Sequence, residues 1–127
     1  MQELQKLVPR IKQLWLDALR SDEYKQGKSS LCLSYKTGKE HCCLGVLCEV
    51  YIKDTGHDIF EKHSSSYDGS SSHPPPIVTE WAFGKTESER LPDWYVIENG
   101  EHVSLTHLND YRHFSFSKIA DMIEESL

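Results

Sequence analysis

The chain has 127 residues, a length typical of one domain, and 38% of them are apolar against 27% charged. These proportions exclude a disordered or fibrous chain. The net charge of −6 argues against a general nucleic-acid-binding protein, which would carry a basic surface, but it allows a small anionic ligand held by one or two local arginines.

The first predicted element is an amphipathic helix. Residues 3–20 repeat apolar side chains with the spacing of one helix face. Pro9 suits the first turn of a helix, because its missing amide hydrogen would have no partner there. We therefore expect the regular part of this helix to begin near Val8 and to end before Gly27.

A hairpin and a second helix follow. Residues 30–35, SLCLSY, alternate like a half-buried strand, KTGK can turn the chain, and residues 40–43 supply a short return strand. The apolar spacing then changes to that of a helix, which Gly56 is expected to end. The stretch HCCLGVLCEV, residues 41–50, therefore spans the junction between strand and helix.

The middle of the chain changes in composition. Serine, glycine and proline dominate residues 62–76, KHSSSYDGSSSHPPP, which predicts a mobile loop within one domain. Residues 77–83 regain apolar character. Residues 93–104 predict a hairpin closed by Asn99 and Gly100, because this pair tolerates the positive φ angles of a type I′ turn.

Two helical segments are expected at the end of the chain. Ser104 is a suitable cap for a short helical turn over residues 105–109, and Ser115 for a closing helix. The order of these elements predicts one α+β domain over residues 1–127. We expect a small antiparallel sheet of two hairpins with three to four helices packed on it.

Three interpretations are open for the cysteine-rich stretch. Zinc sites usually pair their ligands as C-x2-C, a spacing that Cys42, Cys43 and Cys48 lack. A cysteine at a helix N-terminus is a candidate nucleophile, but the local sequences of known cysteine hydrolases are absent here. We favour buried core thiols, with Gly45 letting the helix approach the sheet closely. No metal and no cofactor are expected.

The sequence also predicts a cytoplasmic protein without membrane association. Met1 is followed by Gln, Glu and Lys, not by a basic segment and an apolar run, so no secretory signal is expected. No apolar run approaches the roughly 20 residues of a membrane span. The adjacent pair Cys42 and Cys43 is awkward for a disulfide framework, which agrees with a reducing compartment.

Three segments resemble a family of small proteins encoded by bacteriophages and prophages. They are WLDALRSDEYKQGK, HCCLGVLCEVY and LTHLNDYRHFSFSKIADMIEESL, which together cover 48 of the 127 residues. The family has no assigned activity. Because small phage accessory proteins often act against host defences, the resemblance implies an anti-defence protein of the host bacterial cytoplasm. One class of such proteins sequesters the nucleotide signals of bacterial immunity.

Two groups of residues are candidates for binding a nucleotide. Trp81 and Trp94 are flat surfaces for a base, and Arg90 between them is a donor for phosphate. Core packing is the alternative for each aromatic residue, since at least one side of a strand faces the core.

The segment HLNDYRH, residues 107–113, is the second group. Asn109 and Asp110 are candidates for hydrogen bonds to a base or ribose, and Arg112 is a candidate for pairing with phosphate. The alternative is that Asn109 and Asp110 satisfy the turn and cap the closing helix.

We therefore expect a binding protein that sequesters a small nucleotide-derived immune signal as a homo-oligomer, with no nucleic-acid polymer as a partner. One alternative is a small hydrolase that cleaves such a signal, with Cys43 or two of His102, His107 and His113 as catalytic groups. Another is a protein–protein inhibitor that uses an acidic surface and has no ligand pocket.

Overall fold

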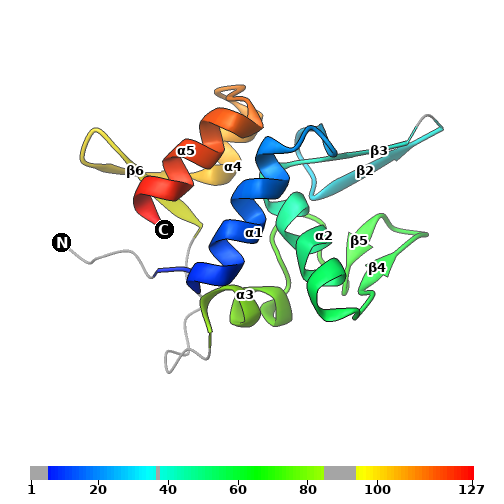
Figure 1. Ribbon diagram of the computed structural model, residues 1–127. Coiled ribbons are helices and arrows are strands. Elements are labelled where there is room, and N and C mark those ends of the chain that lie inside the picture. Colours follow the sequence, from blue (N-terminus) through cyan, green and yellow to red (C-terminus); the bar gives the residue numbers. More distant parts are fainter. Residues whose placement is uncertain (1–5, 37, 85–93) are drawn as a thin grey trace.

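The fold is α+β, as the sequence predicts. The computed structural model describes residues 6–36, 38–84 and 94–127, which form five helices and three small sheets. The helices occupy the centre of the molecule (Figure 1), where α1 contacts both α2 and α5, and α2 also contacts α3 and α4. The bounds of the helices are α1 (Pro9–Arg20), α2 (Cys43–Thr55), α3 (Pro76–Phe83), α4 (Leu105–Asp110) and α5 (Phe116–Ser126).

The strands extend from this helical centre on two sides. The β2–β3 and β4–β5 hairpins lie on one side of Figure 1 and the β6–β7 hairpin lies on the other. A short strand, β1, pairs in parallel with β3, so the largest sheet has the order β1–β3–β2. The bounds are β1 (Lys25–Gln26), β2 (Cys32–Tyr35), β3 (Gly38–His41), β4 (Phe60–Glu61), β5 (Ser66–Tyr67), β6 (Tyr95–Glu98) and β7 (Glu101–Ser104).

The predicted helix ends are confirmed. Val8 is the residue before α1, and Gly56 ends α2 in the left-handed conformation at φ 73°. The hydroxyl of Ser104 accepts a hydrogen bond from the backbone of α4, and the hydroxyl of Ser115 accepts one from the backbone of α5. These ends are decided by local chemistry, which is why the sequence alone indicates them.

The hairpins agree with the prediction in part. Asn99 and Gly100 have φ angles of 51° and 79°, both positive as a type I′ turn requires. The first return strand is Gly38–His41 and not residues 40–43, because Cys42 already precedes the first turn of α2.

The structure also contains elements that the sequence did not indicate. Residues 76–83 form the helix α3, and residues 62–76 include the strand β5. Tyr67 in this strand is fully buried. The mobility of the 62–76 segment stays a prediction.

Helix α2 is buried on most of its sides, because neighbouring elements surround it. Its N-terminal end lies against α1, where Nε1 of the fully buried Trp15 donates a hydrogen bond to the carbonyl of Cys43 at 3.0 Å. A Cβ atom built on Gly45 would lie only 1.8 Å from the carbonyl oxygen of Leu31. The close approach predicted for Gly45 is therefore confirmed.

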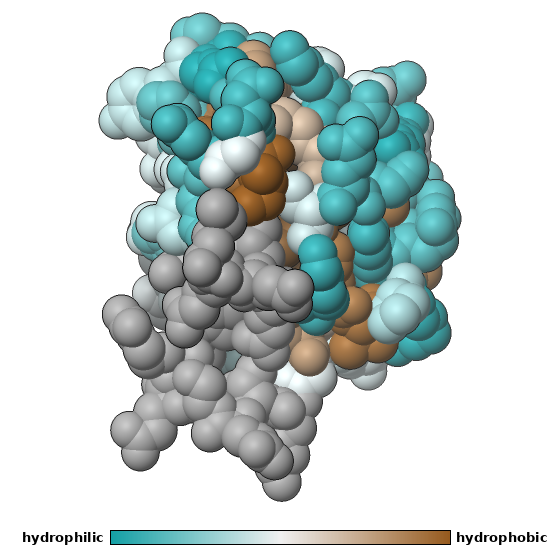
Figure 2. All heavy atoms as spheres, turned by 90° about the vertical axis from the view of Figure 1, so that its left-hand side faces the viewer, coloured by the Kyte–Doolittle hydropathy of each residue, from teal (hydrophilic) through white to brown (hydrophobic). Residues whose placement is uncertain are grey.

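The described part of the chain has no helix long and apolar enough to cross a membrane. On the face drawn in Figure 2, hydrophobic side chains reach the surface in separate areas among hydrophilic ones. The large hydrophobic residues that are exposed come from different parts of the fold: Tyr35, Ile77, Ile97 and Tyr111.

Candidate functional site

Asn109 connects α4 to the segment that contains β1. Its side chain is 1% exposed, and its Nδ2 atom donates hydrogen bonds to the carbonyl of Gly27 and to Asp110, both at 2.8 Å. Its Oδ1 atom accepts a hydrogen bond from Gln26 at 2.8 Å. Both amide hydrogens therefore have protein partners, which gives Asn109 a structural role in this conformation.

Arg112 forms a two-pronged ion pair with Glu98 at the end of β6. The two guanidinium nitrogens lie 2.7 and 3.1 Å from the two carboxylate oxygens, and the guanidinium also lies over the ring of Phe114. The hydrogen bond from Arg112 lowers the pKa of Glu98 below its ordinary value of 4.5. A phosphate at Arg112 would have to compete with this carboxylate.

Replacing Arg112 with alanine should destabilise the fold in a pH-dependent way. Because the folded-state pKa of Glu98 is lowered, its ion pair contributes stability above the ordinary pKa of 4.5 and loses that contribution as the pH falls through the lowered value. Urea unfolding of the parent and of Arg112→Ala should therefore differ more at neutral pH than at about pH 3. A difference of the same size at both pH values would contradict this role of the pair.

The two candidate tryptophans have different environments. Trp94 is 8% exposed and packs edge-on against Trp15, with ring centroids 5.7 Å apart, so it belongs to the core. Trp81 is half-buried in α3, and its Nε1 atom donates a hydrogen bond to Asp54 at 3.1 Å. Arg90 lies outside the described residues.

All four cysteines are buried, which confirms the interpretation of the thiols as core residues. Burial raises the pKa of Cys42 to about 11 and raises that of Cys43 well above its ordinary value. A thiol with a raised pKa is a poor nucleophile at neutral pH. Within the described ranges, no three His, Cys, Asp or Glu side chains gather in a way that could hold a metal ion.

The three histidines of the hydrolase alternative lie in or near β7 and α4. The ring of His102 stacks on Tyr95, and the ring of His107 stacks on Tyr111, with centroids 6.2 and 5.7 Å apart. All three histidines are exposed, and His113 has a positive φ of 54°. The structure shows no hydrogen bond between any two of them.

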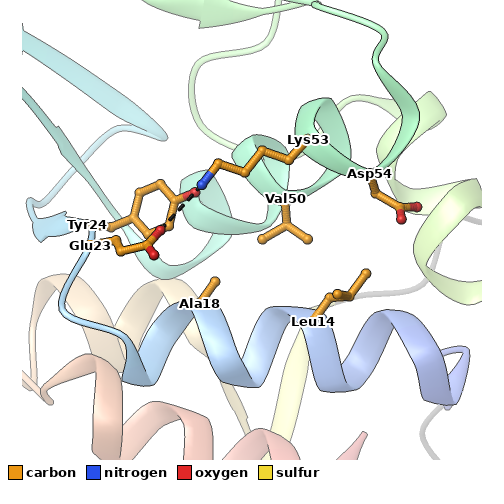
Figure 3. A pocket seen from close by; sticks show the side chains of 7 residues that line it. All are labelled: Leu14, Ala18, Glu23, Tyr24, Val50, Lys53 and Asp54. Carbon is orange, nitrogen blue, oxygen red and sulfur yellow. Dashed lines mark hydrogen bonds and ion pairs between the residues drawn. The ribbon is translucent and has the colours of Figure 1, made fainter.

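A pocket of about 310 Å³ lies between α1 and α2 (Figure 3). Its floor is apolar and consists of Leu14 and Ala18 from α1 and Val50 from α2. Its volume lies at the lower end of the range of pockets that hold small molecules.

Each end of the pocket carries an ion pair. At one end, Lys53 forms an ion pair with Glu23 at 3.3 Å and lies over the ring of Tyr24. At the other end, the carboxylate of Asp54 accepts two hydrogen bonds from Arg10 and one from Trp81.

Both charged ends keep their charge at neutral pH. A hydrogen bond to Tyr24 and the neighbouring Glu23 raise the pKa of Lys53, and the hydrogen bond from Arg10 lowers the pKa of Asp54. An ammonium group has three hydrogens, and a carboxylate has about four acceptor positions. Lys53 and Asp54 can therefore each make a further hydrogen bond to a ligand.

Of the candidate residues predicted from the sequence, Trp81 alone contacts a residue that lines this pocket, through its hydrogen bond to Asp54. Lys53 and Asp54 look like ordinary solvated residues at the end of an apolar helix. Glu23 and Tyr24 belong to a short connection without a motif. Only the packing of α1 against α2 brings these side chains around one pocket.

The comparisons with known proteins give a family without a known activity. Residues 7–127 match the model of a domain of unknown function (DUF8296). No curated protein and no solved structure matches the chain.

Proposed function

The chain belongs to this family of domains of unknown function, and we propose that it is a binding protein that sequesters a small nucleotide-derived anion in the pocket between α1 and α2. The observation that carries the proposal is the arrangement of that pocket. It has an apolar floor and an ion pair at each end, Lys53 with Glu23 at one end and Asp54 with Arg10 at the other.

This arrangement fits a molecule with a flat apolar body and two different polar ends. The body covers Leu14, Ala18 and Val50, and a phosphate oxygen accepts a hydrogen bond from Lys53. A donor group elsewhere on the molecule donates a hydrogen bond to Asp54. Because the chain has a net charge of −6, the anion is attracted by this local cation and not by the overall field.

The biological role that we propose follows from the resemblance to phage-encoded proteins. A protein that removes a nucleotide signal from the host cytoplasm protects a phage against an immune system that depends on that signal. Holding the signal is sufficient for this role, so the proposal requires no catalytic group. We also propose that the protein acts as a homo-oligomer, which sedimentation of the purified chain would test.

Binding is tested by calorimetric titration with a panel of ribonucleoside monophosphates and cyclic mono- and dinucleotides. Lys53→Gln should weaken the binding of the tightest member about tenfold, because it removes a partly screened contact to phosphate. Lys62→Gln is the matched control, since Lys62 is exposed and lies outside the pocket. Equal affinities of Lys53→Gln and the parent would place the site elsewhere.

The same sample separates a binding protein from a hydrolase. After saturation with the tightest nucleotide, the protein is heat-denatured and the released molecule is analysed by mass spectrometry. Recovery of the intact nucleotide supports sequestration. Recovery of a cleaved nucleotide would support the hydrolase alternative, and failure of the whole panel to bind would leave the protein–protein inhibitor.

A further inference from the structure

A histidine without hydrogen-bond partners is buried behind the proposed pocket. His41, the last residue of β3, is 4% exposed, and neither of its ring nitrogens has a partner among the described residues. Burial lowers the pKa of His41 to about 4, so its ring is neutral at physiological pH. A neutral imidazole carries one donor and one acceptor, and leaving both unpaired in the interior costs free energy.

The groups around His41 do not satisfy it. Oε1 of Glu49 lies 3.7 Å from Nε2 of His41, which is beyond hydrogen-bonding distance. Burial raises the pKa of Glu49, although Lys39 opposes that shift. The hydroxyl of the fully buried Tyr67 also has no partner in hydrogen-bonding geometry within the described chain, and burial, together with the nearby Glu49, raises its pKa.

Tyr24 contacts both the pocket and His41. The ring of Tyr24 lines the pocket, and it also packs edge-on against the ring of His41, with centroids 5.6 Å apart at 90°. Tyr24 lies in the connection between α1 and β1 and is half-buried. Because Tyr24 belongs to no helix or strand, its side chain is the one that we expect to move.

We infer that the ligand site continues behind Tyr24, and that His41 forms a hydrogen bond to the edge of an uncharged planar heterocycle such as a nucleobase. This inference rests on the proposed function and adds the part of the ligand that the outer pocket does not specify. Lys53 holds the anionic end, and Tyr24 moves aside to let the heterocycle reach His41.

The chemistry of this inner part selects the class of group. A charged group would lose its hydration without an opposite charge to pair with, because His41 is neutral there. A heterocycle whose edge carries a donor beside an acceptor, such as the amino and imine edge of adenine, can pair with the one nitrogen of His41 that faces it, whether that nitrogen donates or accepts. The ring of the displaced Tyr24 remains available for stacking on the base.

Access to His41 is tested with diethyl pyrocarbonate, which acylates neutral imidazole, followed by peptide mass spectrometry. In Tyr24→Ala the acylation rate of His41 should rise at least tenfold above that of the parent. The control is Tyr35→Ala, because Tyr35 is 54% exposed and lies in the distant part of β2. Free adenine at millimolar concentration should then slow the acylation of His41 in Tyr24→Ala several-fold.

A second measurement uses the parent protein, in case Tyr24→Ala does not fold. Adenine should shift the ring nitrogen resonances of His41 in histidine-labelled protein. His41→Phe should fold, because it replaces an unpaired polar ring with an apolar one of similar shape, and it should weaken adenine binding about tenfold.

The outcomes separate this inference from the proposed function. Adenine effects at His41 without any effect of Lys53→Gln on nucleotide binding would support the inner site and overturn the outer one. Nucleotide binding that depends on Lys53 but leaves the resonances and the acylation of His41 unchanged would overturn the inner site alone. Unchanged His41 reactivity in a folded Tyr24→Ala protein would overturn the role of Tyr24.

Discussion

Replacing Gly45 with alanine should destabilise the fold by about 3 kcal/mol or more. The added Cβ atom would lie 1.8 Å from the carbonyl oxygen and 2.7 Å from the carbonyl carbon of Leu31. Both atoms belong to the backbone, so no side chain can rotate away from the clash. The first turn of α2 would have to move away from the segment before β2, where the fully buried Leu31 makes the contact.

The expected loss is larger than any gain in helix propensity. Alanine favours a helix over glycine by only about 1 kcal/mol in an exposed position. The change is measured by urea unfolding followed by circular dichroism. Gly56→Ala is the matched control, because Gly56 has open space around its Cα but a φ of 73°. It should cost about 1–2 kcal/mol from backbone strain alone. Similar losses in the two variants would contradict the close packing at Gly45.

The sequence indicated those parts of the fold that depend on local chemistry. Ser104 and Ser115 cap their helices with their own hydroxyl groups, and Asn99 and Gly100 turn the last hairpin. Gly45 lies between apolar residues where their spacing changes from that of a strand to that of a helix. This pattern predicted close packing without identifying the segment that packs there. The α+β class follows from the order of such local signals.

The parts that were missed depend on contacts between distant segments. β1 has two residues and exists because it pairs with β3, from which β2 separates it in the sequence. β5 occurs in a serine-rich segment that has little strand propensity of its own. In both cases tertiary packing decides the structure, and a short sequence window does not contain that information.

The candidate site was difficult to predict for the same reason. Polar side chains in a turn, such as Asn109, can bind a ligand or can satisfy the protein backbone, and the sequence does not distinguish the two. Lys53 and Asp54 are unremarkable until α1 covers the face of α2 beside them. His41 ends a short strand and belongs to no motif, and only its burial without partners indicates a role.

Asn109→Ala should reduce the free energy of unfolding by about 2–3 kcal/mol. The substitution removes two donors and one acceptor at once. The carbonyl of Gly27 would lose its hydrogen bond from Asn109, and Gln26 would keep only its bond to the carbonyl of Phe114. Leaving buried polar groups without partners costs more than the hydrogen bonds contributed, which is why the expected loss exceeds that of an ordinary surface substitution.

The same variant tests whether this position binds the ligand. If Asn109 acts only through the protein, Asn109→Ala should unfold earlier in urea but bind the tightest nucleotide of the panel with the affinity of the parent at low temperature, where it is still folded. Asp110→Ala is the matched control, since Asp110 is less buried and receives only one of the hydrogen bonds. A large loss of affinity in Asn109→Ala without a loss of stability would contradict a purely structural role. It would mean that Asn109 contacts the ligand and that the ligand site lies at α4.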